Sequence, residues 1–332
     1  YMTQFEEAWE NAQKGLEIAR ELDDQVHRGW LLAEPIPYYH LRKGDFAAAR
    51  AALVESLEIG TRIGELGVQA VSAYLLAEMA RWQGEYEHAL EYGKRSLEAA
   101  LPLEPYMPFF LVPSLGSLGM VYVEISEQFR DKIAEFHRHA LRLLEDPAGA
   151  LNGSPAWSCL AYCAITLGDH KVAGDSIEKG LNTPNLYMRL ERPHHLAGAA
   201  LLASARDEHA EAIRRAEEAR AYAEEHGMRY VYPLLSLIMG KVLVKAGQAE
   251  AGLAWLGQAE AEALEFGMRP VIWRARAAAS QLLAEAGQPE KAAAKRAAAE
   301  AMAREIANLF QEEELRAAYL RNVLPKIQSN AH

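Results

Sequence analysis

The sequence of 332 residues predicts an all-α fold, an α-solenoid of about seven helix–turn–helix units. Three observations support this prediction. Glycine turns recur at a spacing near 40 residues or close to twice that number, and a fixed period of this size marks a repeat array. Between the turns, apolar residues follow the helical period, and almost no stretch alternates as a strand would. A chain that is 50% hydrophobic is also able to bury a core of the required size.

The turn within each unit is expected to combine a glycine with a residue that starts a helix. Glycine supplies the positive φ that ends a helix, and the Asp, Glu or Gln that follows helps to start the next helix. Two further turns that lack glycine are expected near Gln128 and near Asp207, which brings the mean period close to 40. The turn glycines are Gly44, Gly84, Gly168, Gly247 and Gly287.

Each unit is expected to contain an apolar first helix and an amphipathic second helix. The stretch VQAVSAYLLAEMARWQ (68–83) precedes a turn and is apolar-rich, whereas YEHALEYGKRSLEAAL (86–101) follows it with apolar residues at helical spacing. A second, looser turn closes the unit and is visible around Gly227 and Gly267. The repeat is therefore a pair of helices joined by two kinds of turn.

The whole chain, 1–332, is interpreted as one array with two interruptions and a cap. Prolines make the segment 101–113 irregular, because proline breaks or kinks a helix. The segment 146–155 is expected to be a loop, with Ser154 as N-cap and Pro155 as the first helical residue of the next helix. A closing helix is expected at 311–328. The chain opens inside an amphipathic pattern without an initiator Met, so we expect it to be part of a longer protein.

Small residues at fixed points of the units resemble those of the tetratricopeptide repeat (TPR) family. If the turn glycine takes that family's register, Ala161 and Gly240 fall on its small site in the first helix, and Trp157 falls on its early Trp. Small side chains let helix axes approach closely. The corresponding sites in the second helix are Ala49, Ala89, Ala173 and Ala292.

The period departs from the family's, since it is near 40 rather than about 34 residues. In this respect the chain resembles the long-period TPR arrays of bacterial LuxR-type regulators of the maltose-activator kind and of ATPase-linked adenylate/guanylate cyclases. The resemblance implies a right-handed superhelix whose first helices line a concave groove, the usual site for peptides or partner segments.

The composition argues against several classes of partner. A formal net charge of −11 makes direct nucleic-acid binding unfavourable, because phosphates require a surplus of Lys and Arg. The Ala-rich run 290–307 is interpreted as an exposed helix with i,i+4 ion pairs. We find no apolar run of about 18 residues and no signal peptide, so no membrane association and a cytoplasmic location are expected. Cys159 and Cys163 are expected to be small buried residues.

We find no constellation of residues that would support catalysis or bind a cofactor. The sequence contains none of the common zinc-protease, hydrolase or dinucleotide-binding motifs. His137 and His139 would point to different faces of a helix, and the pair His194–His195 has no evident third metal ligand. We therefore expect no enzymatic activity, no metal and no cofactor.

Candidate binding residues follow from the family's groove positions and are implied by the resemblance. Tyr38, Tyr122 and Tyr162 take the same position in three units and would form a tyrosine ladder. The alternative is that these tyrosines pack between neighbouring units. Lys241, Lys245 and Arg274 would meet an acidic end of the ligand. The full set is Tyr38, Arg42, Tyr74, Glu78, Arg81, Trp82, Tyr122, Tyr162, Lys241, Lys245 and Arg274.

These features favour a non-enzymatic protein-interaction module, the regulatory or scaffolding arm of a larger bacterial signalling or transcription-regulatory protein. Its partner would be a protein or peptide segment in the groove or flanking domains of the same polypeptide, and a homodimer through the array ends is a further option. The alternative, also implied by the resemblance, is a small-molecule sensor in which Trp82, Tyr74 and Tyr38 stack on a sugar. An enzyme assembled from residues distant in sequence is the third hypothesis.

Overall fold

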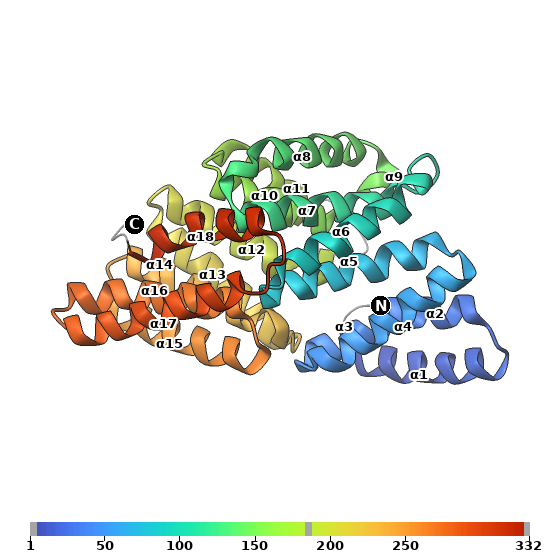
Figure 1. Ribbon diagram of the computed structural model, residues 1–332, viewed down its shortest axis with the longest axis horizontal. Helices are drawn as coiled ribbons and strands as arrows, with labels where there is room; N and C mark the ends of the chain where they lie inside the picture. The colour runs from blue at the N-terminus through green and yellow to red at the C-terminus, as the bar shows by residue number, and fades with distance from the viewer. Residues whose placement is uncertain (1–4, 183–187, 329–332) are drawn as a thin grey trace.

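The computed structural model describes residues 5–182 and 188–328, and within these ranges the protein is helical throughout, with no strand. Helices that follow each other in the chain pack against each other along its whole length (Figure 1). The prediction of an all-α fold built by sequential packing of helices is therefore confirmed. The core consists of apolar residues shared between neighbouring helices.

The helices alternate with short turns and a few 3₁₀ segments. In the N-terminal part they are α1 (Phe5–Glu21), α2 (Gln25–Ala33), α3 (Pro35–Lys43), α4 (Phe46–Ile63), α5 (Leu66–Gln83) and α6 (Tyr86–Ala100). In the middle they are α7 (Leu111–Ile125), α8 (Arg130–Leu144), α9 (Pro147–Ala150), α10 (Ser154–Thr166), α11 (His170–Asn182), α12 (Met188–Ala205) and α13 (His209–Glu225). The C-terminal part contains α14 (Tyr232–Lys245), α15 (Ala249–Phe266), α16 (Arg269–Glu285), α17 (Pro289–Ala307) and α18 (Glu313–Gln328).

The expected turns form with the expected backbone geometry. All five turn glycines are left-handed, with φ between 70° at Gly287 and 83° at Gly44. In the turn without glycine, Asp207 takes the left-handed conformation itself, with φ of 61°. Near Gln128 the chain instead passes through an extended Ser126, whose hydroxyl accepts a hydrogen bond from the Gln128 amide at 3.3 Å. Three different local solutions thus turn the chain at equivalent points.

The two interruptions differ in detail from the expectation. Between α6 and α7 the chain forms the 3₁₀ segments η1 (Leu101–Leu103) and η2 (Pro108–Phe110). The segment 146–155 contains the short helix α9, whose N-cap is Asp146. The prediction that Ser154 caps the next helix is wrong, because Gly153 is the N-cap and Ser154 is already helical. The Ser154 hydroxyl lies instead 2.9 Å from His195 Nε2 in the core.

Two other expectations from composition also need correction. The stretch Pro108–Ile125 is long and apolar enough to span a membrane, but 83% of it is buried in the fold, as for a core helix. In α17 the described residues show no i,i+4 ion pair. Lys295 pairs instead with Glu260 of α15 at 2.5 Å, because the neighbouring helix offers a carboxylate within reach.

The array winds far enough for its early units to touch its late ones. Arg42 donates from Nε to the carbonyl of His226 at 3.0 Å, and Arg229, in the 3₁₀ segment η4 (Arg229–Val231), donates to the carbonyl of Lys43 at 3.0 Å. One unit further along, Arg269 donates to the carbonyl of Gln83 at 2.9 Å. These pairs lie about 186 residues apart in the sequence.

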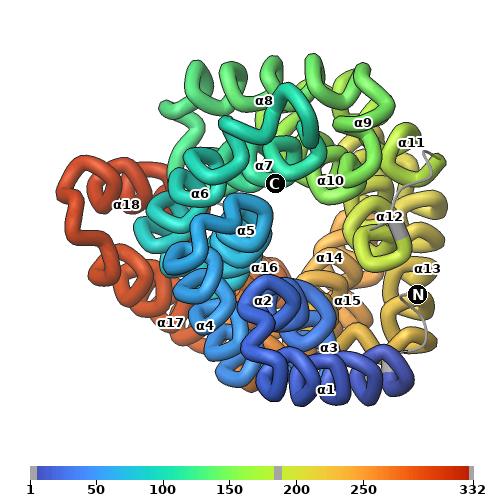
Figure 2. Tube along the Cα trace, turned by 90° about the vertical axis from the view of Figure 1, so that its right-hand side faces the viewer, coloured from blue at the N-terminus to red at the C-terminus, as the bar shows by residue number. Residues whose placement is uncertain are grey.

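Apolar contacts and the last helix complete this closure. Phe46 stacks on Phe266 with ring centroids 5.7 Å apart. Helix α18 packs on α7, where Asn322 donates from Nδ2 to the carbonyl of Ile125 at 3.1 Å. Seen along the winding axis, the chain surrounds a centre, and α8, α11 and α13 lie outside α7, α10 and α12 (Figure 2). The concave side is therefore an interior.

The buried His195 and the half-buried His137 make stability depend on pH. Burial lowers the pKa of His195 to about 3 and that of His137 to about 4, from an ordinary value of 6.5. Below 6.5 the unfolded chain binds protons that the folded chain does not, so stability is expected to fall as pH drops from 6.5 towards 4. The limiting slope is about 1.4 kcal/mol per pH unit for each histidine. Urea unfolding of His195→Gln should show a shallower loss, and an unchanged slope would contradict this origin.

Candidate ligand site

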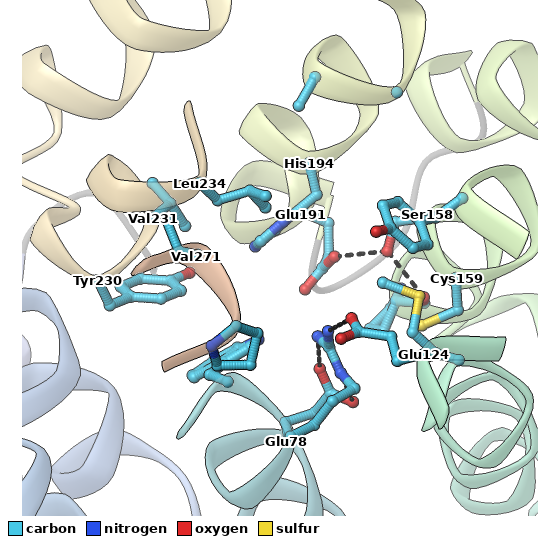
Figure 3. A pocket seen from close by; sticks show the side chains of 18 of the residues that line it. Glu78, Glu124, Ser158, Cys159, Glu191, His194, Tyr230, Val231, Leu234 and Val271 are labelled. Carbon is cyan, nitrogen blue, oxygen red and sulfur yellow. Dashed lines mark hydrogen bonds and ion pairs between the residues drawn. The ribbon is translucent and has the colours of Figure 1, made fainter. Parts of the chain in front are cut away.

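A cavity of about 100 Å³ lies inside the closed array. Its walls come from α3, α5, α7, α10, α12, α14 and α16, with η4 at one side. These are the helices that precede the turn within each unit, which agrees with the expectation that first helices line the concave face. Figure 3 shows side chains from several of them converging on one space.

A buried ion cluster forms one wall of the cavity. Arg81 lies between two carboxylates, with Nη2 at 2.6 Å from Glu78 and Nη1 at 3.0 Å from Glu124. Arg274 reaches Glu124 from α16 at 3.1 Å. The Tyr86 hydroxyl donates to Glu124 at 2.7 Å, and the Ser117 hydroxyl donates to Glu78 at 2.6 Å. The cluster joins α5, α6, α7 and α16, so it also ties an early unit to a late one.

The charges in this cluster stabilise one another. Burial by itself raises the pKa of Glu124, but Arg274, Arg81 and the Tyr86 hydroxyl outweigh it and lower the pKa below the ordinary value. Burial lowers the pKa of Arg274, whereas Glu124 raises it, and the net shift is upward. Both groups therefore remain charged at neutral pH. The arrangement is rigid, because each charge has at least one charge-assisted hydrogen bond.

The opposite wall carries a carboxylate without a cationic partner among the described residues. Glu191 of α12 accepts a hydrogen bond from the Ser158 hydroxyl at 2.9 Å and points towards the cavity beside His194 (Figure 3). Burial raises the pKa of Glu191, while nearby His194 and the bond from Ser158 lower it, and the net shift is upward. Glu191 is therefore the acceptor in this cavity that is least satisfied by the protein.

Aromatic rings and apolar side chains complete the lining. The Trp82 and Tyr230 rings lie 5.5 Å apart, and Tyr38, Tyr74 and Tyr162 also line the cavity. Ring faces give a large contact area at a small cost in rotamer entropy. Cys159, which is a free thiol, lines the same space, and it is buried together with Cys163 as expected.

A second cavity of about 490 Å³ adjoins the first. The two cavities share Glu124, Tyr162 and Arg274 as lining residues. The second cavity extends from α10 along α14, α16 and α18. Its polar lining residues outside the shared wall are Thr166, Lys241, Gln281, Asn322 and Lys326. It is therefore formed partly by the closing helix.

The structure brings most of the candidate residues together. Those that line the first cavity are Tyr38, Tyr74, Glu78, Arg81, Trp82, Tyr162 and Arg274. Lys241 lines the second cavity, beside Tyr162 and Arg274. Most of the predicted groove positions therefore line a cavity rather than an open groove. The two basic residues Lys241 and Arg274 line the second cavity, which α18 borders.

Three candidate residues lie elsewhere. Tyr122 is buried, and its ring contacts are with Phe129 and Phe136 of its own unit rather than with a neighbouring unit. Its neighbours Met120 and Glu124 line the cavity instead, and Tyr122 falls on another side of α7 because two residues are half a turn. Arg42 holds the closure with His226. Lys245 is exposed and pairs with Asp207 at 2.8 Å, away from both cavities.

Sequence reasoning missed three residues of the site. Glu124 is the only charged residue in the apolar helix α7, and a lone charge in such a helix is a signal that could have identified it. Glu191 lies in the unit without a turn glycine, where the register is hard to assign. Tyr230 belongs to a short 3₁₀ segment between helices. Neither of these two residues carries a local signal.

Among the described residues, no group of three or more His, Cys, Asp or Glu side chains is arranged to bind a metal ion. Comparison of the sequence with models of known protein families and with curated proteins gives no match.

Proposed function

We propose that this protein is a TPR-like, right-handed solenoid with a period near 40 residues that acts as a non-enzymatic, cytoplasmic sensor of a small polar molecule. The observation that carries this proposal is the closure of the array around an interior cavity. In an open superhelix the concave face would accept an extended peptide. Here contacts about 186 residues apart in sequence enclose it.

The size and lining of the cavity favour a small ligand over a peptide. A space of about 100 Å³ suits a compact metabolite, and a peptide passing through it would have to separate the closure contacts. The rings of Tyr38, Tyr74 and Trp82 offer faces for stacking, while Glu191 and Ser158 offer hydrogen-bonding groups. A sugar or polyol, which has both apolar faces and hydroxyl groups, matches this combination.

Ligand binding would act on the array through the closure. A ligand that touches α5, α12 and α16 at once is bound only when these helices are together. Binding would therefore stabilise the closed array relative to any opened form. The free energy of this stabilisation is set by the difference in the ligand's affinity for the two forms. Such a change is what a regulatory arm of a signalling or transcription-regulatory protein would transmit.

A screen of sugars and polyols by thermal shift and tryptophan fluorescence tests the proposal. A true ligand should raise the melting temperature and change the emission saturably, because Trp82 lines the cavity. Glu191→Gln should weaken binding about tenfold, since it removes the charge from one hydrogen-bonded acceptor.

The matched control is Glu225→Gln, an exposed glutamate on α13 outside the cavity. It should leave the affinity unchanged. If both variants bind like the wild type, or if no compound in the screen gives a saturable response, the interior is not a sensor site.

A protein-interaction module is the second candidate function. It is favoured by apolar side chains that remain exposed at the N-terminal end of the array, where Ile18, Leu22 and Val26 are 55%, 73% and 43% exposed. A partner protein or a flanking domain of the same polypeptide would cover these apolar side chains. Partner capture that depends on Leu22 and is indifferent to Glu191 would favour this function over the sensor.

A further inference from the structure

The second cavity is strongly unbalanced in charge. Its ionisable lining residues are the cations Lys241, Arg274 and Lys326 and the carboxylate Glu124, apart from the tyrosine hydroxyl of Tyr162. Glu124 is already engaged by Arg81, Arg274 and Tyr86 in the ion cluster. Lys326 pairs with exposed Glu127 at 3.4 Å. Lys241 is therefore the lining cation that has no carboxylate partner among the described residues.

Lys241 is the least compensated of these cations. Among the described residues its ammonium group makes no hydrogen bond and no ion pair, although it faces a space of about 490 Å³. Desolvation by the surrounding helices lowers the pKa of Lys241, and the charges of Arg274 and Lys326 lower it further. The residue is nevertheless exposed, so its ammonium group is accessible to an anion from solution.

We propose that this second cavity is a binding site for a small phosphate-bearing anion, held by Lys241, Arg274 and Lys326. A phosphate monoester carries nearly two negative charges at neutral pH, which can engage the unpaired Lys241 and also Lys326, whose ion pair with Glu127 is exposed. Its three oxygens accept several hydrogen bonds, for which the two ammonium groups are the donors, since the Thr166 hydroxyl in the same lining already donates to the carbonyl of Tyr162 at 2.9 Å. A cavity of this volume has room for an attached organic group beside Trp273.

The closing helix α18 takes part in this site. Lys326 comes from its last turn, and Asn322, one turn earlier, bonds the carbonyl of Ile125 on α7. An anion bound between Lys241 on α14 and Lys326 on α18 would therefore hold the cap against the array. The site lies outside the first cavity except for the shared wall, so this proposal stands independently of the proposed sensor function.

Isothermal titration calorimetry with inorganic phosphate and with glucose 6-phosphate tests the site, in HEPES buffer at low ionic strength. The wild-type protein should bind both, and Lys241→Gln should lower the affinity at least about tenfold by removing one charge-assisted contact. Lys241→Arg should retain most of the binding, because it preserves the charge.

The matched control is the variant Lys245→Gln. Lys245 lies one turn further along α14 and is exposed like Lys241, but it pairs with Asp207 outside the cavity. This variant should bind phosphate like the wild type. Absence of binding to the wild type, or equal losses in the two glutamine variants, would overturn the proposal. Binding of citrate without binding of phosphate would overturn the assignment to a phosphate group.

Failure of this site and failure of the sensor function give different results. Lys241 lines only the second cavity, and Glu191 lines only the first. Phosphate binding that is lost in Lys241→Gln and kept in Glu191→Gln therefore supports the anion site whether or not a sugar binds. Circular dichroism of each variant checks that the helical fold is intact.

Discussion

Replacing Glu124 with glutamine is expected to lower the free energy of unfolding by about 3–5 kcal/mol. The glutamine keeps the volume of the side chain but removes the negative charge that Arg81 and Arg274 share. Both guanidinium groups lie in the interior and would lose an ionic partner, while Arg81 would keep Glu78. Urea unfolding followed by circular dichroism measures the loss.

The pH dependence of the same variant provides a second readout. The pKa of Glu124 in the folded protein lies below its ordinary value of 4.5, so the carboxylate contributes stability that is fully present above 4.5. This contribution is lost as pH falls through the lowered folded pKa. The difference in stability between wild type and Glu124→Gln should therefore be constant near neutral pH and shrink in acid.

Glu127→Ala is the matched control, because Glu127 lies three residues further along and its ion pair with Lys326 is exposed. Its loss should be less than about 1 kcal/mol, as for other surface ion pairs. A loss for Glu124→Gln no larger than this control would show that the buried cluster contributes little net stability.

Replacing Gly44 with alanine is expected to destabilise the protein by about 2–5 kcal/mol. Part of this loss, about 1–2 kcal/mol, comes from the left-handed backbone with φ of 83°. The rest arises because a Cβ atom would lie 2.5 Å from the Phe266 ring, which belongs to a late unit of the array. Overpacking of this kind costs about 1–3 kcal/mol.

Gly287→Ala separates the two contributions. Gly287 occupies the equivalent turn with φ of 70°, but no atom lies within 4 Å of the position that its Cβ would take. It should lose only the backbone contribution. The excess loss at Gly44, measured by thermal and urea unfolding, is therefore the effect of crowding the closure. Equal losses at the two positions would mean that the contact between the early and late units accommodates the extra methyl group with no loss of stability.

The sequence alone was sufficient to predict the helices and most of the turns. Gly84 and Gly247 end their helices where predicted, because a left-handed C-terminal residue is a local requirement that only glycine meets easily. The small residues at helix crossings could likewise be predicted from the sequence. Ala49 and Ala89 are fully buried, and Gly240 has no room for a Cβ, which would lie 2.8 Å from Leu256.

The candidate site could be predicted only in part. Seven of the candidate residues meet in one cavity, because the first helices present equivalent faces towards the centre. The register expected for α7 does not match the structure: Met120 and Glu124 line the cavity, whereas Tyr122 packs against Phe129 and Phe136.

The helix pairs and most of their turns could be predicted from the chain's residues, because each depends on residues within one or two units, and lining by first helices was implied by the family resemblance. That the array closes on itself became evident only from the three-dimensional structure. Closure depends on the small rotation between successive units, which adds up until Arg42 meets His226 and Arg269 meets Gln83. A contact between residues about 186 positions apart leaves no local signal, yet it encloses the concave side of the array around a cavity.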